Sequence, residues 1–164
     1  HEMTHGFDDQ GRQYDKEGNM NDWWTAEDTE KFNARADKLV AYFDRIEVLP
    51  GLNANGRFTL GENIADQGGV LVSYEAYKKA TAAAPLEDKD GFTADQRFFL
   101  AYAGVWASNI RDEEIRRLTR IDEHSLGKWR VDGTLPHVAP WYDAFNVTPA
   151  DPMYIAPEER AVVW

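Results

Sequence analysis

Cysteine is absent from the sequence of 164 residues. The chain therefore holds no disulfide bond and offers no thiolate ligand to a metal. This absence leaves the cellular compartment open, because proteins of oxidising compartments can also lack cysteine. Long apolar segments are absent as well, since the sequence has no run of about eighteen apolar residues. No segment of the chain is therefore predicted to span a membrane.

Basic residues are scarce relative to acidic residues. Lysine and arginine total 18 against 29 aspartate and glutamate residues, which gives a net charge of −11. A surface this acidic argues against nucleic acids and anionic membranes as partners, because both bind to basic patches.

Apolar residues are plentiful: hydrophobic residues make up 43% of the chain and aromatic residues 13%. This composition is too apolar for a disordered chain, and the length fits one domain, residues 1–164, with a buried core. Apolar spacing and capping residues predict a mainly α fold with few short strands. Helices are expected after Thr25 to about residue 46, at 61–84, from the capping box of Thr93 and Gln96 to about 110, at 113–119 and at 140–145.

The segments between these helices are expected to be mostly loops. Residues 1–7 are interpreted as the end of a helix, followed by a polar loop at 8–22. Glycine and proline predict a turn-rich connector at 50–56. The remaining expectations are a short extended stretch at 57–60, a charged linker at 86–92, an irregular or extended segment at 124–135 and an irregular tail from 148.

The first five residues, HEMTH, have the spacing of a metal site. On a helix, His1 and His5 lie on one face, so both imidazoles can place a nitrogen about 2.0–2.1 Å from one zinc ion. Glu2 lies beside the first ligand, where a carboxylate can accept a proton from zinc-bound water. The alternative is a chance match, which average residue usage places at roughly one in 200 for a chain of this length.

Two carboxylates at the start of the second long helix can complete such a site. Glu62 and Asp66 are four residues apart and share a helix face. One can bind the metal while the other accepts the ring N–H of a ligating histidine. The competing interpretation is compensation of the helix dipole, which would be favoured if these residues stood alone. Beside HEMTH, the metal interpretation is favoured.

Longer segments carry a resemblance to a known family. Residues 1–9 read HEMTHGFDD and residues 61–69 read GENIADQGG. Both resemble the signature segments of the neprilysin family of zinc endopeptidases. The similarity covers essentially the whole chain, because it includes Gly11-Arg12, the run from Asn21 to Trp24, and the ending from Asp151-Pro152-Met153-Tyr154 through Val163-Trp164.

The resemblance implies a thermolysin-like zincin catalytic subdomain that binds one zinc ion per chain. It implies that His1, His5 and Glu62 are the zinc ligands. It also implies that Glu2 is the general base, which activates water and later passes the proton to the leaving amine. Asp66 would orient His1, and Asp8 would orient His5.

The resemblance further implies substrate contacts. His124 would stabilise the oxyanion of the tetrahedral intermediate, and Arg130 would bind a substrate carbonyl on the primed side. Val105 and Trp106 would line the pocket for a bulky apolar side chain. The residue types alone favour other roles: a loop histidine is more often at the surface, an arginine more often in a salt bridge, and apolar helix residues more often in the core.

The resemblance also bears on what surrounds the chain. Family members are several times longer and carry an N-terminal helical region that closes over the site, and an edge strand that pairs with substrate. We expect residues 1–164 to be the C-terminal part of the catalytic domain, with the missing N-terminal portion as a partner. The expected location is extracytoplasmic: periplasmic, secreted, or anchored to a membrane through that portion. The lack of cysteine favours a bacterial member, because animal relatives are rich in disulfides.

The expected activity is zinc-dependent hydrolysis of internal peptide bonds in oligopeptides. The alternative is a non-catalytic module that binds peptide, or a structural fragment that is inactive without the N-terminal portion. Three metal ligands together with Glu2 favour the enzyme, because degenerate members of enzyme families usually lose one of these residues.

Overall fold

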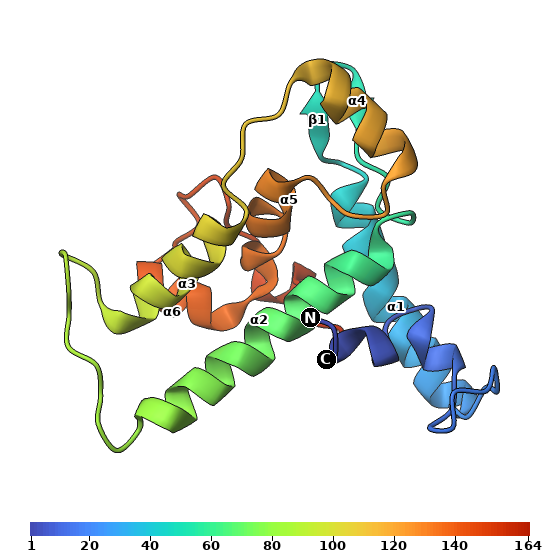
Figure 1. Ribbon diagram of the computed structural model, residues 1–164, viewed down its shortest axis with the longest axis horizontal. Helices are drawn as coiled ribbons and strands as arrows, with labels where there is room; N and C mark the ends of the chain where they lie inside the picture. The colour runs from blue at the N-terminus through green and yellow to red at the C-terminus, as the bar shows by residue number, and fades with distance from the viewer.

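The computed structural model describes residues 1–164. Helices dominate it and its strands form one short hairpin, so the predicted mainly α fold is confirmed (Figure 1). The α-helices are α1 (Ala26–Phe43), α2 (Leu60–Thr81), α3 (Ala94–Val105), α4 (Asp112–Ile121), α5 (Gly127–Asp132) and α6 (Ala139–Phe145). The strands are β1 (Glu47–Leu49) and β2 (Leu52–Asn53), and the 3₁₀ turns are η1 (Thr4–Phe7), η2 (Gly11–Gln13), η3 (Leu135–His137) and η4 (Pro157–Glu159).

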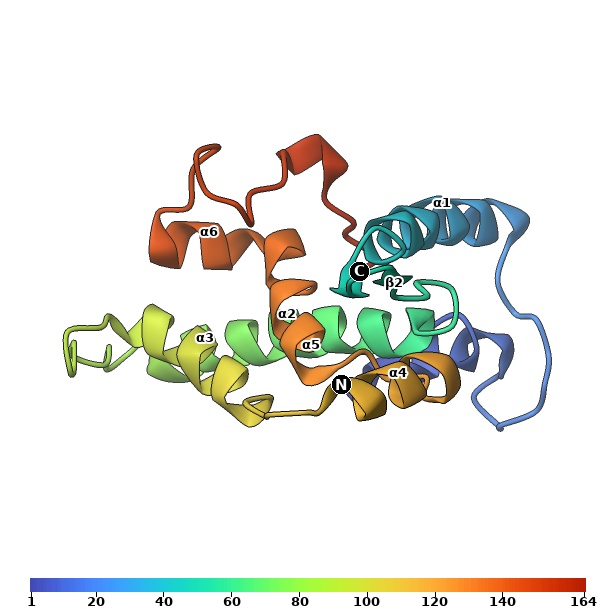
Figure 2. The same cartoon turned by 90° about the horizontal axis from the view of Figure 1, so that it is seen from above.

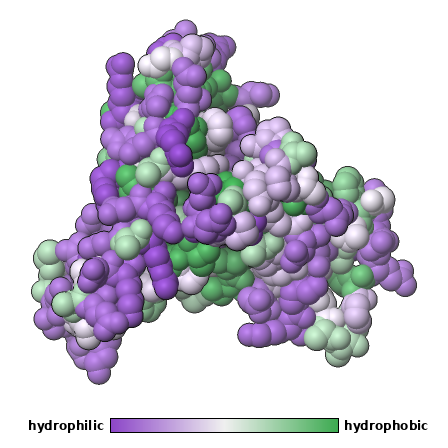
Figure 3. Space-filling model, turned by 180° about the vertical axis from the view of Figure 1, so that it is seen from behind, coloured by the Kyte–Doolittle hydropathy of each residue, from purple (hydrophilic) through white to green (hydrophobic).

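Helix α2 runs through the middle of the molecule and divides the core into two clusters. Figure 2 shows α1 and α6 on one side of α2, and α3 and α4 on the other. The first cluster joins α1, the first half of α2 and the C-terminal tail, with Phe43, Leu60 and Val163 among its buried members. The second joins the other half of α2 to α3, η3 and α6. Hydrophilic residues cover most of the face in Figure 3, and apolar residues show through mainly near its centre.

The N-terminal segment lies directly on α2, which is possible because two glycines face it. A Cβ atom on Gly68 would come within 2.6 Å of Cγ2 of Thr4, and one on Gly69 within 2.6 Å of the backbone nitrogen of His1. Any larger side chain would push the segment away from the helix. This close approach brings the histidines near the carboxylates of α2.

Several local predictions are confirmed and others are wrong. Thr25 caps α1, and Thr93 with Gln96 forms the predicted capping box of α3. Residues 57–60 are not extended, because the strands lie earlier, on either side of Gly51, whose φ of +75° suits a tight turn. The prediction of an irregular segment at 124–135 is wrong, because α5 lies within it. Helix α3 ends at Val105, five residues before the predicted end.

None of the helices combines the length and the apolar character needed to cross a bilayer.

His137 is a buried histidine that should make folding sensitive to pH. It is 2% exposed, its Nδ1 accepts the backbone N–H of Ala161 at 3.1 Å, and its ring packs edge-on against Tyr42. Burial, together with the charge of Arg160, lowers the pKa of His137 to about 4. The unfolded chain therefore binds this proton more readily than the folded chain between about pH 4 and pH 6.5.

We expect the free energy of unfolding to fall by about 2 kcal/mol between pH 7 and pH 4.5 because of this one group. The measurement is urea unfolding of the parent protein and of His137→Gln at both pH values. Glutamine does not titrate, so its variant should lose less stability on acidification by about that amount. Equal losses in the two proteins would show that His137 does not contribute.

Candidate metal centre

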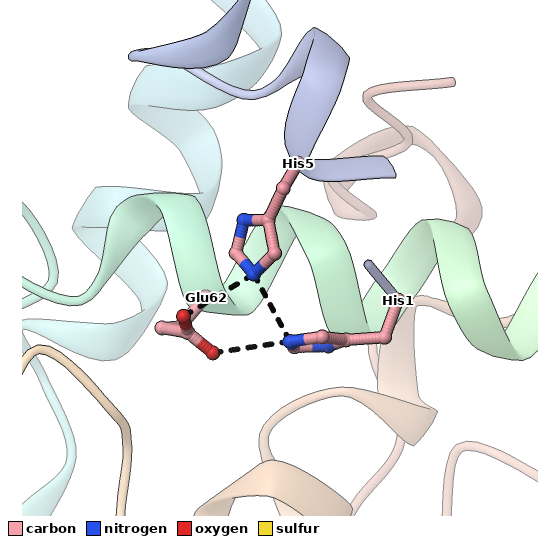
Figure 4. A group of neighbouring side chains, drawn as sticks. All are labelled: His1, His5 and Glu62. Atoms are coloured by element: carbon pink, nitrogen blue, oxygen red, sulfur yellow. Dashed lines mark hydrogen bonds and ion pairs between the residues drawn. The ribbon is translucent and has the colours of Figure 1, made fainter. Parts of the chain in front are cut away.

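Three side chains from distant parts of the sequence converge beside α2. His1 and His5 come from the N-terminal segment and η1, and Glu62 from the first turn of α2 (Figure 4). Nε2 of His1 lies 3.3 Å from Oε2 of Glu62, and Nε2 of His5 lies 3.3 Å from Oε1. The two Nε2 atoms are 3.1 Å apart.

The hydrogen bonds on the outer side of each ring define the tautomers. Nδ1 of His1 lies 2.9 Å from Oδ1 of Asp66, and Nδ1 of His5 lies 2.6 Å from Oδ2 of Asp8. An ionised carboxylate can only accept, so each Nδ1 donates its proton. In the neutral rings, both Nε2 atoms then carry lone pairs that face each other and the carboxylate of Glu62.

Three acceptors held together in this way can bind a cation between them. Donor atoms about 2.0–2.1 Å from a tetrahedral zinc ion lie about 3.3–3.4 Å apart, close to the separations observed here. Two imidazoles and one carboxylate are also a usual ligand set for catalytic zinc, which leaves a fourth position for water or substrate. The residues present therefore fit zinc.

Asp8 is itself held firmly. It is 5% exposed, and its second oxygen accepts the backbone N–H groups of Gln10 at 2.9 Å and Gly11 at 2.7 Å. Gly11 is required there, because a Cβ atom would lie 1.8 Å from the carbonyl oxygen of His5. The fixed carboxylate in turn fixes the ring of His5.

The charges around His5 favour a bound cation. Burial alone lowers the pKa of His5, but the hydrogen bond that its ring donates to Asp8 and the charges of Glu62, Asp8 and Glu2 together raise it. The same negative charges that favour a proton on His5 also attract a metal cation to this ring.

Arg130 lies beside the two carboxylates of α2, Glu62 and Asp66. It is 5% exposed, and its Nε and Nη2 donate to Asp66 at 2.7 Å and 2.8 Å. Nη2 also lies 3.2 Å from Oε2 of Glu62, and the guanidinium lies 4.0 Å above the ring of Trp106. Burial lowers the pKa of Arg130, but the hydrogen bonds and charges of Asp66 and Glu62 raise it overall.

Asp66 thus accepts hydrogen bonds from His1 and Arg130 at once. Burial raises its pKa, and the neighbouring guanidinium only partly offsets this effect. Asp66 is 3% exposed, so it needs both donors to remain charged in the interior. The sequence suggested a role beside a histidine for Asp66, but the link to Arg130 depends on tertiary contacts.

His124 lies between α4 and α5, at the edge of the same site. Its Nε2 is 3.4 Å from Oε1 of Glu62, and its Nδ1 is 2.7 Å from Oδ1 of Asp122. The backbone and ring N–H groups of His124 lower the pKa of Asp122. Sequence reasoning missed Asp122, although an aspartate two residues before a loop histidine is a pattern for this kind of turn.

A hollow of about 490 Å³ opens beside the converging histidines. Val105 is 72% exposed there, so the core position that its residue type alone favoured is wrong. Tyr102 also lines the hollow, and its hydroxyl donates to the carbonyl of Arg130 at 2.7 Å, a contact that no sequence pattern indicated. The residues around the hollow are His1, Glu2, Asp66, Gly69, Val70, Ser73, Tyr102, Val105, Trp106, His124 and Arg130.

Comparison with known proteins identifies the family of this chain. The model of the family described as peptidase family M13 matches residues 1–161. The chain belongs to peptidase family M13. The resemblance to the neprilysin family is therefore confirmed.

Curated M13 relatives match the entire chain. It is 40% identical to human membrane metallo-endopeptidase-like 1 and 39% identical to human endothelin-converting enzyme 1, and it covers 21% of each. The chain thus spans about a fifth of the length of these relatives.

Solved M13 structures share the fold. The zinc metalloprotease Zmp1 of Mycobacterium tuberculosis, in complex with an inhibitor, has a TM-score of 0.94 at 36% identity, over 98% of this chain and 25% of that one. PepO of Lactobacillus rhamnosis has a TM-score of 0.81 at 34% identity, over 97% of this chain and 24% of that one. The predicted fold class, part of a zincin catalytic domain, is confirmed by this likeness.

Proposed function

We propose that this chain is the zinc-binding, catalytic part of an endopeptidase that hydrolyses internal peptide bonds of oligopeptides. The observation that carries this proposal is the convergence of Nε2 of His1, Nε2 of His5 and the carboxylate of Glu62, with separations of 3.1–3.3 Å. Membership of peptidase family M13 supports the reaction class. His1, His5 and Glu62 would hold one zinc ion per chain, with Asp66 and Asp8 fixing the two rings.

Bound zinc supplies a Lewis acid that polarises the scissile carbonyl and lowers the pKa of a water molecule toward about 7. Glu2 is the proton acceptor in this proposal. It follows His1 directly and lines the 490 Å³ hollow. Its carboxylate takes a proton from the attacking water and later passes it to the leaving amine.

His124 would stabilise negative charge on the substrate oxygen. When both ring nitrogens carry protons, Nδ1 donates to Asp122 and Nε2 is free to donate to the developing oxyanion. Asp122 would hold the ring in this orientation. The separation of 3.4 Å between Nε2 and Glu62 supports the proposal, because it places the donor beside the metal ligands.

Arg130 and its neighbours would bind the primed side of the peptide. Asp66 and Glu62 occupy Nε and Nη2 of Arg130, whereas no hydrogen bond within the chain engages Nη1. Nη1 can therefore donate to a substrate carbonyl. Val105 and Trp106 stand at the same hollow and would accept a bulky apolar side chain.

The rest of the protein would complete the enzyme. Because the chain spans about a fifth of its curated relatives, we propose that it is the C-terminal part of a catalytic domain and acts together with an N-terminal portion. That portion would close over the hollow and help to bind peptide. An extracytoplasmic location is part of the proposal, and the name of the relative membrane metallo-endopeptidase-like 1 supports it.

The test uses the protein that contains this chain. Metal analysis should find one zinc ion per chain, and an internally quenched peptide should be cleaved between internal residues. A chelator should stop cleavage, and one equivalent of zinc should restore it. Peptide binding without cleavage in the zinc-loaded protein would instead support the alternative of a non-catalytic module.

A further inference from the structure

The loop that carries His124 joins α4 to α5 at the edge of the site. The His124 side chain is 47% exposed. A hollow lies on one side of the loop, lined by residues of the hairpin region and of α4, including Val48, Ala54 and Thr119.

Ser125 connects this loop to α2. Its hydroxyl donates to Oδ1 of Asn63 at 2.7 Å, and Asn63 directly follows Glu62 in the chain. Asn63 is 1% exposed, and its Nδ2 donates to Oγ1 of Thr59 at 2.9 Å. The Thr59 hydroxyl donates in turn to the carbonyl of Asn55 at 3.1 Å.

Each hydrogen bond in this series donates in the same direction, from Ser125 toward Asn55. The proton of the Thr59 hydroxyl is used by the Asn55 carbonyl, so Oγ1 accepts from the amide nitrogen of Asn63. The amide oxygen must then face the loop, where the hydroxyl of Ser125 is its donor. Removing that hydroxyl would leave a buried acceptor without a partner, which favours a shift of the loop.

We infer that Ser125 and Asn63 form a positioning pair that sets the place of His124 beside Glu62, an inference that rests on the proposed function of His124. The bond joins a residue next to His124 with a residue next to Glu62. Nε2 of His124 and Oε1 of Glu62 lie 3.4 Å apart. Asp122 belongs to the same loop, so it orients the ring without tying the loop to α2. Ser125 and Asn63 do not touch the reacting atoms and act through His124.

The test is Ser125→Ala in the zinc-loaded protein, alone and combined with His124→Ala. We expect Ser125→Ala to lower kcat about tenfold with KM within about twofold, because a misplaced group that acts in the transition state affects kcat. Ser125→Thr keeps the hydroxyl and should restore kcat to within about threefold. In the His124→Ala protein, the change at Ser125 should lower kcat no further, because the two residues act as one unit.

A matched control removes a hydroxyl from the far end of α2. Oγ1 of Thr81 bonds only to the carbonyl of Tyr77 in its own helix, at 2.9 Å, so Thr81→Ala should leave kcat within about twofold of the parent. A parental kcat for Ser125→Ala would overturn the inference. Equal losses of kcat with and without His124 would also overturn it, since they would indicate a general structural role.

A crystal structure of the zinc-loaded Ser125→Ala protein separates this inference from the proposed function. We expect Nε2 of His124 to move by about 1 Å or more from its place beside Glu62. An unchanged position would refute the positioning role. If the parent protein cleaves no peptide, the proposed function fails, and the position of His124 in this crystal structure still decides whether Ser125 positions it.

Discussion

Replacing Glu2 with glutamine is expected to lower kcat for peptide cleavage by about 10³-fold, because the amide cannot accept a proton from the attacking water. Glutamine keeps the size of the side chain and leaves His1, His5 and Glu62, the proposed zinc ligands, in place. The zinc content of Glu2→Gln should therefore equal that of the parent. The measurements are cleavage of an internally quenched peptide and metal analysis of the same sample.

A matched control comes from the same residue type. Glu75 lies exposed on α2, away from the hollow, so Glu75→Gln should cleave at the parental rate. Cleavage by Glu2→Gln at the parental rate, with zinc bound, would show that another group accepts the proton. Loss of zinc from Glu2→Gln would instead assign Glu2 to metal binding.

Replacing Asp66 with asparagine is expected to lower the free energy of unfolding by about 3–5 kcal/mol, because it leaves the buried guanidinium of Arg130 without its main counter-charge. Asp66 is 3% exposed and Arg130 5% exposed, so little water can replace the lost carboxylate. The same change loosens the ring of His1 and should weaken zinc binding by about 10- to 100-fold. Urea unfolding should be measured with a chelator present, so that lost zinc does not contribute to the difference.

A second replacement separates the two effects of Asp66. In the double variant Asp66→Asn, Arg130→Met, the buried guanidinium that lacked a counter-charge is removed, so part of the stability should return. Zinc affinity should stay low, because His1 still lacks its carboxylate. As a control, Asp37→Asn disrupts the exposed pair with Arg57 and should cost less than about 1 kcal/mol. Parental stability and zinc affinity in Asp66→Asn would contradict both assigned contacts.

Local spacing in the sequence was enough for much of the fold. The capping residues Thr25 and Thr93 predicted where α1 and α3 begin, because an N-cap acts on backbone groups within its own turn. The short elements were missed for the opposite reason. Helix α5 and the hairpin β1–β2 contain too few residues to show a hydrophobic period, and they owe their stability to packing.

In the candidate site, too, some relations follow from local spacing and others only from tertiary contacts. Sequence alone determined that His1, Glu2 and His5 lie within one short segment, and that Glu62 and Asp66 share one face of a helix, because both relations follow from spacing. Only the tertiary structure decided that these two segments meet. It also decided that Asp66 serves His1 and Arg130 together, and that Ser125 bonds to Asn63. Partners separated by more than sixty residues leave no trace in local spacing, because burial and packing of the whole chain bring them together.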